Sequence, residues 1–457
     1  MIIPVIKTAF IQRLCDFLDP DECLRLAKIH GWYKRRGKIH PAEFLIGQVC
    51  GQASALHPSL SAQSQSYQNP VTRQAVDARY NQPAVDFFVA AFNHALHRSL
   101  EEKPDPPALS LLQEQFAAVR LFDSTQFALP ASLVVPFPAC GGGGSQAGLK
   151  VLLAYEYLLS QFQPLAVLPA KRSDQGLAGQ VGAWVGAREL GLFDKGFFSG
   201  PVLRAIHERG GYFLIPWPRS VTLWQTTPTA PPVSVPLAQR LRAHEGNRLE
   251  LVALRLGQGA TALPEVRLLA YRLSVESAGR RRFALREKCR TYGRLPTAEA
   301  LELAGWEILV TNLLAQKLPA AAAIYLYRLR WQIELIFKQL KSVLRIDEVP
   351  TGKEHRLQCE VWARLLAGLL LFSCHRYTNA ACWAEHRCEI SFAKLARRLQ
   401  HEGLGLARAI FAGGGQLHRS LDRLWDQLLK SARKGVQRSR QTTWQKICAH
   451  WLEPLPA

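Results

Sequence analysis

Three carboxylates of this 457-residue chain stand at positions from which they could act together. Asp123 ends the apolar run VRLF, Asp194 follows the short run LGLF, and Glu334 lies in YLYRLRWQIELIFKQLK (325–341). Carboxylate oxygens are the ligands that hard divalent cations prefer. Two such cations, about 3.5–4 Å apart, activate water or a 3′-hydroxyl and stabilise the leaving oxygen of an in-line phosphoryl transfer. The sequence therefore raises the hypothesis of a metal-dependent phosphoryl-transfer site.

The stretch 325–341 surrounds its single carboxylate with cations. On one continuous helix, at about 100° per residue, its polar side chains share a narrow stripe. The stripe contains Tyr327, Arg330, Glu334, Lys338 and Lys341. A neighbouring sector is apolar, as in a helix packed on a core, and holds Leu329, Ile333, Ile336, Phe337, Leu340 and Leu344. A solvated helix face with a few i,i+4 ion pairs would give the same stripe, so this stretch alone decides nothing.

The elements that must position these residues indicate a mixed α/β core. Periodicity predicts the order β-β-β-α-β-α-β between residues 119 and 217, which suits a central sheet with helices on its faces. Two of the strands lie in GLKVLLAYEYLLSQFQPLAVLPA (148–170) and are expected to turn near Ser160 to Pro164. The preceding CGGGGSQ (140–146) lacks the Lys-Ser/Thr ending of a phosphate-binding loop, so we expect a flexible hairpin loop there.

Composition divides the rest of the chain into further regions. The Pro-rich, charged EEKPDPPALS (101–110) indicates a domain boundary. Alternating runs after residue 218 predict a mostly β insertion with a basic tip at Arg280, Arg281 and Arg282. The fold class is therefore α/β with a β-rich insertion and helical flanks. The expected regions are a helical N-terminal domain (1–105), the first part of the core (110–217), the insertion (218–305), the rest of the core (306–375) and a helical, basic C-terminal region (376–457).

The charge balance indicates a polyanionic partner. The chain carries 57 Lys and Arg against 36 Asp and Glu, a net charge of +21 with a pI near 9.8. Neutralising phosphates releases condensed counterions and provides affinity without sequence readout. The basic turn WYKRRGKIH (32–40) is flanked by aromatic residues and could contact a DNA backbone, although a solvated loop explains it equally well.

Other signals argue against a membrane, secreted or zinc-binding protein. No apolar run reaches 18 residues, and LLAGLLLFSC (365–374) is too short to span a bilayer, so we expect a buried helix. The first 20 residues show none of the features of a signal peptide. The ten cysteines form no CxxC pair and are expected to be reduced intracellular thiols. The patch CHRYTNAACWAEHRC (374–388) fits no zinc ligand spacing.

Taken together, the motifs resemble one enzyme family. The chain contains Asp, Asp and Glu in this order, and the Glu lies in the spacing Y-x2-R-x3-E-x6-K, at Tyr327, Arg330, Glu334 and Lys341. This pattern is similar to the signature of the insertion sequence 4 family of DDE transposases. FDSTQF and FDKGFF look like the motifs around that family's first and second aspartates. The likeness runs from about residue 110 to about residue 375 and is weaker in the N-terminal helices.

The resemblance implies an RNase H-like core that is interrupted by the insertion. It assigns Asp123, Asp194 and Glu334 to two Mg²⁺ or Mn²⁺ ions as the catalytic triad. It assigns Tyr327, Arg330 and Lys341 to DNA phosphates, and Lys338 on the same stripe is expected to join them. Trp306 is the candidate for stacking on a flipped base, with a packed core Trp as an equal alternative.

The function implied by the resemblance is cut-and-paste transposition of a bacterial insertion sequence. Water would attack a phosphodiester at the element end, and the freed 3′-hydroxyl would attack the other strand or the target DNA. The expected partners are double-stranded DNA, as terminal inverted repeats and target, and a second copy of the chain in a homodimer. We expect a cytoplasmic protein at the nucleoid. Two alternatives stay open: an RNase H-like nuclease without strand transfer, and a catalytically silent DNA-binding descendant.

Overall fold

The computed structural model describes most of the chain, as two compact units. The described residues are 2–17, 19–53, 59–69, 71–100, 110–140, 145–227, 230–257, 262–348, 351–386, 388–412, 414–433 and 443–451. The helix-rich unit comprises Met1–Leu109, Ser124–Lys171 and Glu334–Ser439, and the sheet-rich unit comprises Ser110–Asp123, Arg172–Ile333 and Arg440–Ala457. The predicted boundary at 101–109, the glycines 141–144 and the basic residues 434–442 lie outside the described residues.

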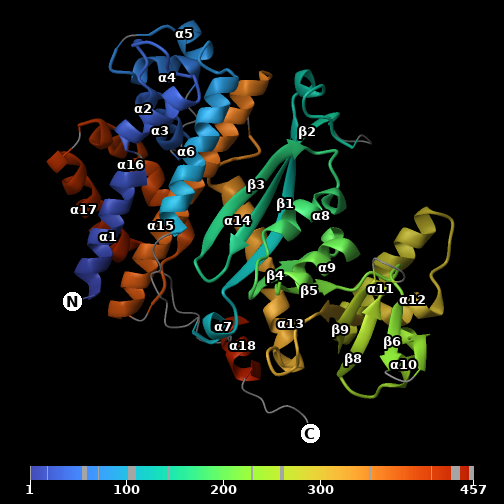
Figure 1. The fold of residues 1–457 in the computed structure, drawn as a ribbon. Coiled ribbons are helices and arrows are strands. Elements are labelled where there is room, and N and C mark those ends of the chain that lie inside the picture. Colours follow the sequence, from blue (N-terminus) through green and yellow to red (C-terminus); the bar gives the residue numbers. More distant parts are fainter. Residues whose placement is uncertain are drawn as a thin grey trace. The chain divides into compact units, whose positions relative to one another are not determined.

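The strands form a mixed sheet in the order β3-β2-β1-β4-β5-β10-β9-β8-β6-β7 (Figure 1). Their bounds are β1 (Ala118–Leu129), β2 (Ala147–Glu156), β3 (Gln161–Pro169), β4 (Glu189–Phe193), β5 (Tyr212–Pro216), β6 (Leu223–Thr227), β7 (Ala230–Ser234), β8 (Arg248–Leu256), β9 (Leu263–Arg272) and β10 (Trp306–Thr311). With α8 (Asp174–Ala183) and α9 (Gly200–Glu208), the order from β1 to β5 is the predicted β-β-β-α-β-α-β. The hairpin turn lies at 157–160, slightly before the predicted position.

The strands of the insertion continue the same sheet. β9 pairs antiparallel with β10, from Arg272↔Trp306 to Arg267↔Thr311. The helices α10 (Leu237–Ala243), α11 (Val275–Thr291) and α12 (Ala298–Leu303) interrupt these strands. The predicted strands of the insertion are present as β6 to β9, but the predicted basic tip is wrong, because Arg280, Arg281 and Arg282 lie within α11.

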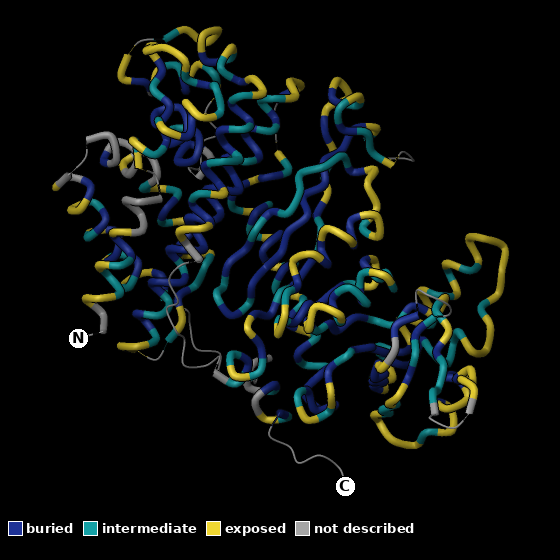
Figure 2. Tube along the Cα trace, viewed as in Figure 1, coloured by how far each residue is buried: buried dark blue, intermediate teal, exposed yellow. Residues whose placement is uncertain are grey.

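Local capping explains why residues 275–291 are helical. The hydroxyl of Ser274 accepts a hydrogen bond from the Ser277 amide at 3.3 Å, which satisfies a free donor of the first turn. Glu276 forms an i,i+4 ion pair with Arg280 at 2.9 Å. Ala278 is the only buried residue of the helix, so the sequence shows no amphipathic stripe. Figure 2 shows the resulting hairpin of α11 and α12 as largely exposed.

In the helix-rich unit, the long helix α15 (Glu354–His386) forms the centre. It packs against α1 (Ile2–Phe17), α3 (Pro41–Ala53) and α6 (Gln82–Leu100). By length and composition α15 could cross a membrane, but 89% of its apolar window is buried within the protein. The prediction of a buried helix at 365–374 is therefore confirmed. Besides most of α14 (Trp331–Ser342), this unit contains α2 (Pro20–Ile29), α4 (Leu60–Ser66), α5 (Arg73–Asp77), α16 (Phe392–Ala412) and α17 (Gly414–Ser431).

Gly368 lets α15 approach its neighbours closely. A Cβ atom at this position would lie 3.0 Å from the Leu340 side chain of α14 (Trp331–Ser342) and 3.1 Å from the Phe162 ring of β3. Such distances are tighter than ordinary van der Waals contact, so a larger residue would push α14 away from α15. This packing therefore holds the segment of α14 that carries Glu334.

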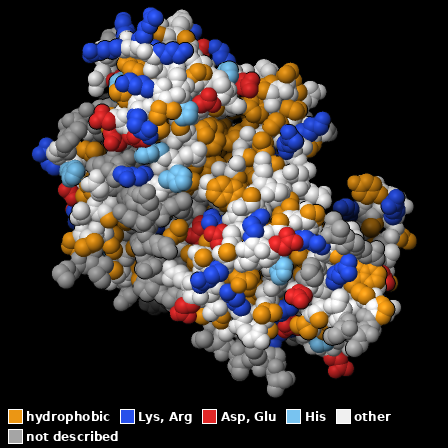
Figure 3. All heavy atoms as spheres, viewed as in Figure 1, with side chains coloured by type: hydrophobic (Ala, Val, Ile, Leu, Met, Phe, Trp, Pro, Cys, Tyr) orange, Lys and Arg blue, Asp and Glu red, His pale blue; other side chains and the backbone are white. Residues whose placement is uncertain are grey.

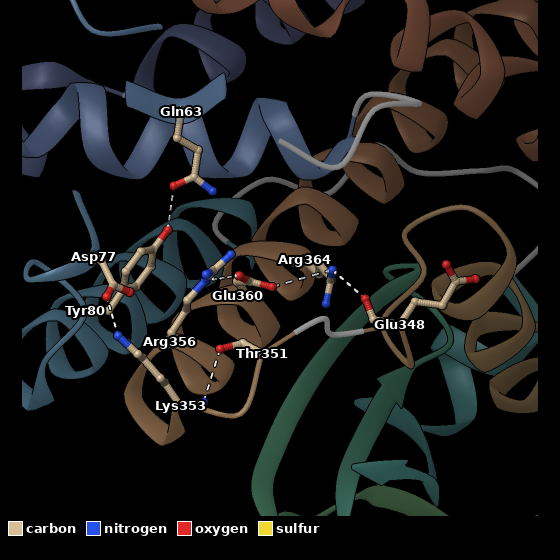
Figure 4. Close-up of polar contacts among 9 residues, drawn as sticks. All are labelled: Gln63, Asp77, Tyr80, Glu348, Thr351, Lys353, Arg356, Glu360 and Arg364. Carbon is tan, nitrogen blue, oxygen red and sulfur yellow. Dashed lines mark hydrogen bonds and ion pairs between the residues drawn. The ribbon is translucent and has the colours of Figure 1, made fainter. Parts of the chain in front are cut away.

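A buried ionic network ties α15 to the segment that precedes it (Figure 4). Arg356 donates to Glu360 at 2.8 Å, and the other carboxylate oxygen of Glu360 lies 3.8 Å from Arg364. Arg364 also donates to the backbone carbonyl of Glu348 at 3.0 Å. Glu360 is 2% exposed and Arg364 is fully buried, so each charge depends on the other. Figure 4 also draws the neighbouring contacts of Gln63, Asp77, Tyr80, Thr351 and Lys353.

Glu360→Gln is expected to destabilise the helix-rich unit, because it removes the carboxylate charge that acts most strongly on the buried guanidinium of Arg364. Breaking such a pair costs about 3 kcal/mol, measurable as a lower urea midpoint followed by circular dichroism. Glu348→Gln is the matched control. The Glu348 side chain is 61% exposed, and the substitution keeps the backbone carbonyl that Arg364 contacts. An equal shift in both variants would contradict this account of the network.

Candidate active site

Two neighbouring parallel strands bring Asp123 and Asp194 together. β1 and β4 pair in register from Ala118↔Glu189 to Phe122↔Phe193. The next residue on each side is an aspartate, Asp123 within β1 and Asp194 directly after β4. The buried rings of Phe122 and Phe193 stack with centroids 5.1 Å apart and an interplanar angle of 8°. This stack therefore fixes the level at which both carboxylates leave the sheet.

Gly191 makes room for that stack. A Cβ atom at Gly191 would lie 2.5 Å from the Phe193 ring and 3.0 Å from Val185. Real Cβ atoms essentially never approach a ring so closely, so a side chain here would displace the Phe193 ring. Gly191, in the run LGLF before Asp194, is therefore required for the stack of Phe122 on Phe193.

One guanidinium faces both carboxylates. Arg330 Nη1 donates to Asp123 Oδ2 at 3.2 Å, and Arg330 Nη2 lies 3.8 Å from Asp194 Oδ1. The side chains of Arg330 and Asp123 are 17% and 21% exposed, while Asp194 is 45% exposed. The second oxygen of Asp194 accepts a hydrogen bond from the Gly196 amide at 3.3 Å. Two like charges are therefore held beside a shared cation, with Asp194 the more open to solvent.

A tight turn delivers Arg330 to this position. The prediction of one continuous helix through 325–341 is wrong, because α13 (Ala320–Arg328) ends at Arg328 and α14 begins at Trp331. Between them, the amides of Leu329, Arg330 and Ile333 each donate to a carbonyl three residues earlier, at 3.0–3.1 Å. Such bonds wind the chain more tightly than an α-helix. The predicted apolar sector is nevertheless buried at every position, from Leu329 to Leu344.

Tyr327 joins α13 to the same strand end. Its hydroxyl donates to the backbone carbonyl of Phe193 at 3.3 Å. Burial raises the pKa of Tyr327 well above its usual value, and the charge of Arg330 opposes this shift only in part. The phenol therefore stays protonated and remains a hydrogen-bond donor at neutral pH. On the far side of α13, the C-terminal helix α18 (Thr443–Trp451) packs against it, with Tyr325 and His450 stacked at 4.6 Å.

A pocket of about 550 Å³ opens beside Asp194. Its cationic lining is Lys195, Arg219, Arg281 and Arg330, and its aromatic lining is Trp217, Trp306 and Tyr327. The predicted residue Trp306 is only 2% exposed; its indole donates to Glu302 at 3.3 Å, and Arg272 lies over its ring at 4.5 Å. Trp217 is half-buried, and its indole donates to the Val221 carbonyl at 2.9 Å.

Sequence reasoning missed several residues of this pocket. Lys195 had a signal, since it follows Asp194 directly in FDKGFF, whereas Arg219 and Trp217 lie in the turn after β5 with no motif around them. The pKa of Lys195 lies below its usual value, first because the surrounding protein disfavours the charged ammonium, then because Arg219 and Lys288 carry like charges. The pocket therefore places four cationic side chains beside the two carboxylates of Asp194 and Glu307.

The remaining predicted site residues belong to the helix-rich unit. Glu334 lies in the first turn of α14 and is half-buried, Lys338 is exposed, and Lys341 is half-buried. Among the residues that the structure describes, no three His, Cys, Asp or Glu side chains form a metal-binding group.

Within the cysteine patch, the thiols of Cys382 and Cys388 lie 3.2 Å apart.

Comparison with known proteins identifies the family. A family model described as a transposase DDE domain matches residues 114–370, more than half of the chain. The chain belongs to the DDE transposase domain family. The matched region contains all the residues assigned from the signature, and the sequence-based prediction of a DDE transposase is confirmed. The narrower assignment to the insertion sequence 4 group stays a prediction.

Individual transposases are similar over most of the chain. The transposase for insertion sequence element IS231B of Bacillus thuringiensis subsp. berliner is 26% identical over 95% of this chain and 93% of its own length. The transposase for insertion sequence element IS1151 of Clostridium perfringens is 25% identical over 93% of both chains. The putative transposase InsL of IS186A from Escherichia coli (strain K12) is 39% identical over a shorter stretch, 23% of this chain and 28% of its own.

A DDE transposase domain implies a divalent metal ion, generally Mg²⁺. The described carboxylates fit such an ion in two respects. Their donors are hard carboxylate oxygens, which Mg²⁺ prefers. Asp123 and Asp194 also already converge on one cationic group, the guanidinium of Arg330, within 3.2 and 3.8 Å. The pair is therefore arranged to share a positive charge.

Gly191→Ala is expected to displace the Phe193 ring and lower both stability and catalytic activity of this DDE transposase. Overpacking of this kind costs about 1–3 kcal/mol, read from chemical denaturation. Gly179→Ala is the matched control in the same unit, because nothing lies within 4 Å of its added Cβ on α8. The control should gain about 0.5–1 kcal/mol, as expected for Gly to Ala within a helix. Equal behaviour of the two variants would refute the role given to Gly191.

Proposed function

We propose that this DDE transposase cuts DNA at the ends of a bacterial insertion sequence and joins the freed 3′-hydroxyl to target DNA. The observation that carries the proposal is the register of β1 and β4, which presents Asp123 and Asp194 together beside Arg330. The similarity to insertion sequence transposases over more than nine-tenths of the chain supports the same reaction.

The residues proposed to hold the metal are Asp123, Asp194 and Glu334, with two Mg²⁺ or Mn²⁺ ions. When bound, such ions activate water or a 3′-hydroxyl and stabilise the leaving oxygen. The role of Glu334 rests on its place in Y-x2-R-x3-E-x6-K, four residues after Arg330. Asp194, the more exposed of the two aspartates, is the one best placed to meet a DNA strand from solvent.

The cations and the phenol are proposed to bind the DNA backbone. Arg330 presents two N–H groups at the carboxylate pair, where negative charge develops on a phosphate during transfer. Tyr327 stays a neutral donor and also fixes the end of β4. Lys338 and Lys341 follow one and two turns after Glu334 on α14 and are assigned to phosphates further along the strand.

The pocket beside Asp194 contains two tryptophans that could stack on an unpaired DNA base, Trp306 and Trp217. Of the two roles expected for Trp306, its burial supports the packing role. The half-buried Trp217 lines the same pocket and is the better candidate for stacking on an unpaired base.

Finer assignments extend the proposal. We assign the chain to the insertion sequence 4 group, with an RNase H-like core interrupted by residues 218–305, and expect a homodimer that joins paired terminal repeats at the nucleoid. The N-terminal helices and the C-terminal region are proposed to recognise the DNA ends. The exposed cations of residues 34–38 support a backbone contact by the N-terminal helices.

The test is a cleavage assay on a duplex that carries the terminal repeat of the chain's own element. With Mg²⁺, the wild type should nick at the repeat boundary and transfer the new 3′-end to target DNA. Asp123→Asn, Asp194→Asn and Glu334→Gln should each lose at least about a thousandfold in rate, as expected when a metal ligand is removed. Removal of the metal with a chelator should stop the wild type.

Binding measured in parallel separates the alternatives. The three variants should still bind the duplex, because phosphate contacts supply most of the affinity. Cleavage without joining by the wild type would favour a nuclease, and binding without cleavage would favour a silent descendant. Either result would overturn the proposal.

A further inference from the structure

A group of cations beside the site lies outside the family signature. Lys195 is the first residue of a short 3₁₀ helix (Lys195–Phe197), directly after Asp194. Arg219 lies in the turn after β5, and Lys288 lies on α11. Lys195 and Arg219 line the 550 Å³ pocket that also contains Asp194. The charge of Lys288 is close enough to act on Lys195.

The carboxylates of Asp194 and Glu307 also line the pocket, but neither forms an ion pair with these three cations. None of Lys195, Arg219 and Lys288 forms an ion pair within the part of the chain that the structure describes. Arg281, on the pocket wall, differs, because it pairs with Glu307 and also donates to the Trp306 carbonyl at 3.2 Å. Like charges gathered at one pocket repel one another unless an anion lies between them. The cluster is therefore arranged for a ligand with negative charge.

The geometry of α11 selects one of its faces for that ligand. Arg281, Ala284 and Lys288 share a face, at spacings of three and four residues. Arg281 and Ala284 line the pocket, and the short side chain of Ala284 leaves it open. The opposite face carries Phe283, which is 65% exposed, with Arg286 and Arg290. Only the first face thus continues the cationic wall that begins at Lys195.

The surface around the pocket fits a nucleic acid strand better than a small anion. On its pocket face, α11 presents Arg281 and Lys288, which continue the cations Lys195 and Arg219 of the pocket. Figure 3 shows Lys and Arg side chains next to hydrophobic ones on the hairpin of α11 and α12. Cations beside the aromatic rings of Trp217 and Tyr327, as in this pocket, suit a polymer of phosphates and bases.

We propose that Lys195, Arg219 and Lys288 bind a backbone phosphate of the DNA strand that lies beside Asp194. The cluster is a positioning element that sets the direction of the strand along α11, in addition to the contacts of Tyr327, Arg330, Lys338 and Lys341. This inference rests on the proposed function and adds a DNA contact that the signature does not contain.

The experiment measures binding of a fluorescein-labelled terminal-repeat duplex against salt concentration, with Ca²⁺ in place of Mg²⁺. The pocket variant combines Lys195→Gln, Arg219→Gln and Lys288→Gln. The control combines Arg286→Gln, Arg290→Gln and Arg294→Gln, which remove the same charge from exposed positions of the same hairpin. In the pocket variant, the slope of log Kobs against log salt concentration should fall in magnitude by about 1, because one phosphate contact is lost. In the control variant, the slope should stay unchanged.

Single substitutions test the same inference in case the triple variant does not fold. Lys288→Gln changes an exposed residue of α11 and should lower the slope in part, whereas its control Arg286→Gln should leave the slope unchanged. Equal slopes for the pocket variant and its control would show that these cations act only through net charge, and would overturn the inference.

The wild type separates this inference from the proposed function. If the wild type cleaves the repeat in Mg²⁺ and the pocket variant keeps the full salt slope, only the phosphate site is wrong. If the wild type neither binds nor cleaves the repeat, the proposed function itself fails.

Discussion

The stack of Phe122 on Phe193 is the contact on which the rest of the site depends. It fixes β1 and β4 in parallel register, so that the residue after each ring is an aspartate at the same level of the sheet. Gly191 is required because any side chain there would meet the Phe193 ring. The guanidinium of Arg330 then faces both carboxylates, at 3.2 Å from Asp123 and 3.8 Å from Asp194.

Electrostatics joins the site to the surface around it. The aspartate pair needs positive charge, and the pocket beside it is lined by cations that need negative charge. A phosphodiester strand and divalent metal ions satisfy both demands, which neither an uncharged substrate nor a free metal ion would do. The net charge of +21 extends the same attraction over the molecule and favours rapid association with DNA.

Much of this arrangement could be predicted from the sequence, because apolar runs mark the buried parts of strands and helices, although β1 continues beyond Asp123 to Leu129. The β-β-β-α-β-α-β order and the buried sector from Leu329 to Leu344 are of this kind. The break after Arg328 could not be predicted, because one turn of i→i+3 bonds leaves the apolar sector from Leu329 to Leu344 buried as in a continuous helix. α11 escaped prediction because it buries only Ala278, and Arg219 because its position depends on tertiary packing.

The central claim is that Asp123, Asp194 and Glu334 bind the same metal ions. The most direct measurement replaces Mg²⁺ with Fe²⁺ and, after adding ascorbate and peroxide, maps where hydroxyl radicals cut the polypeptide. The account predicts that the polypeptide is cut near all three residues. Excess Mg²⁺ should suppress these cuts, and the Asp123→Asn substitution should abolish the cuts at all three places. Cuts near Asp123 and Asp194 without any near Glu334 would contradict it, because Glu334 would then lie outside the metal site.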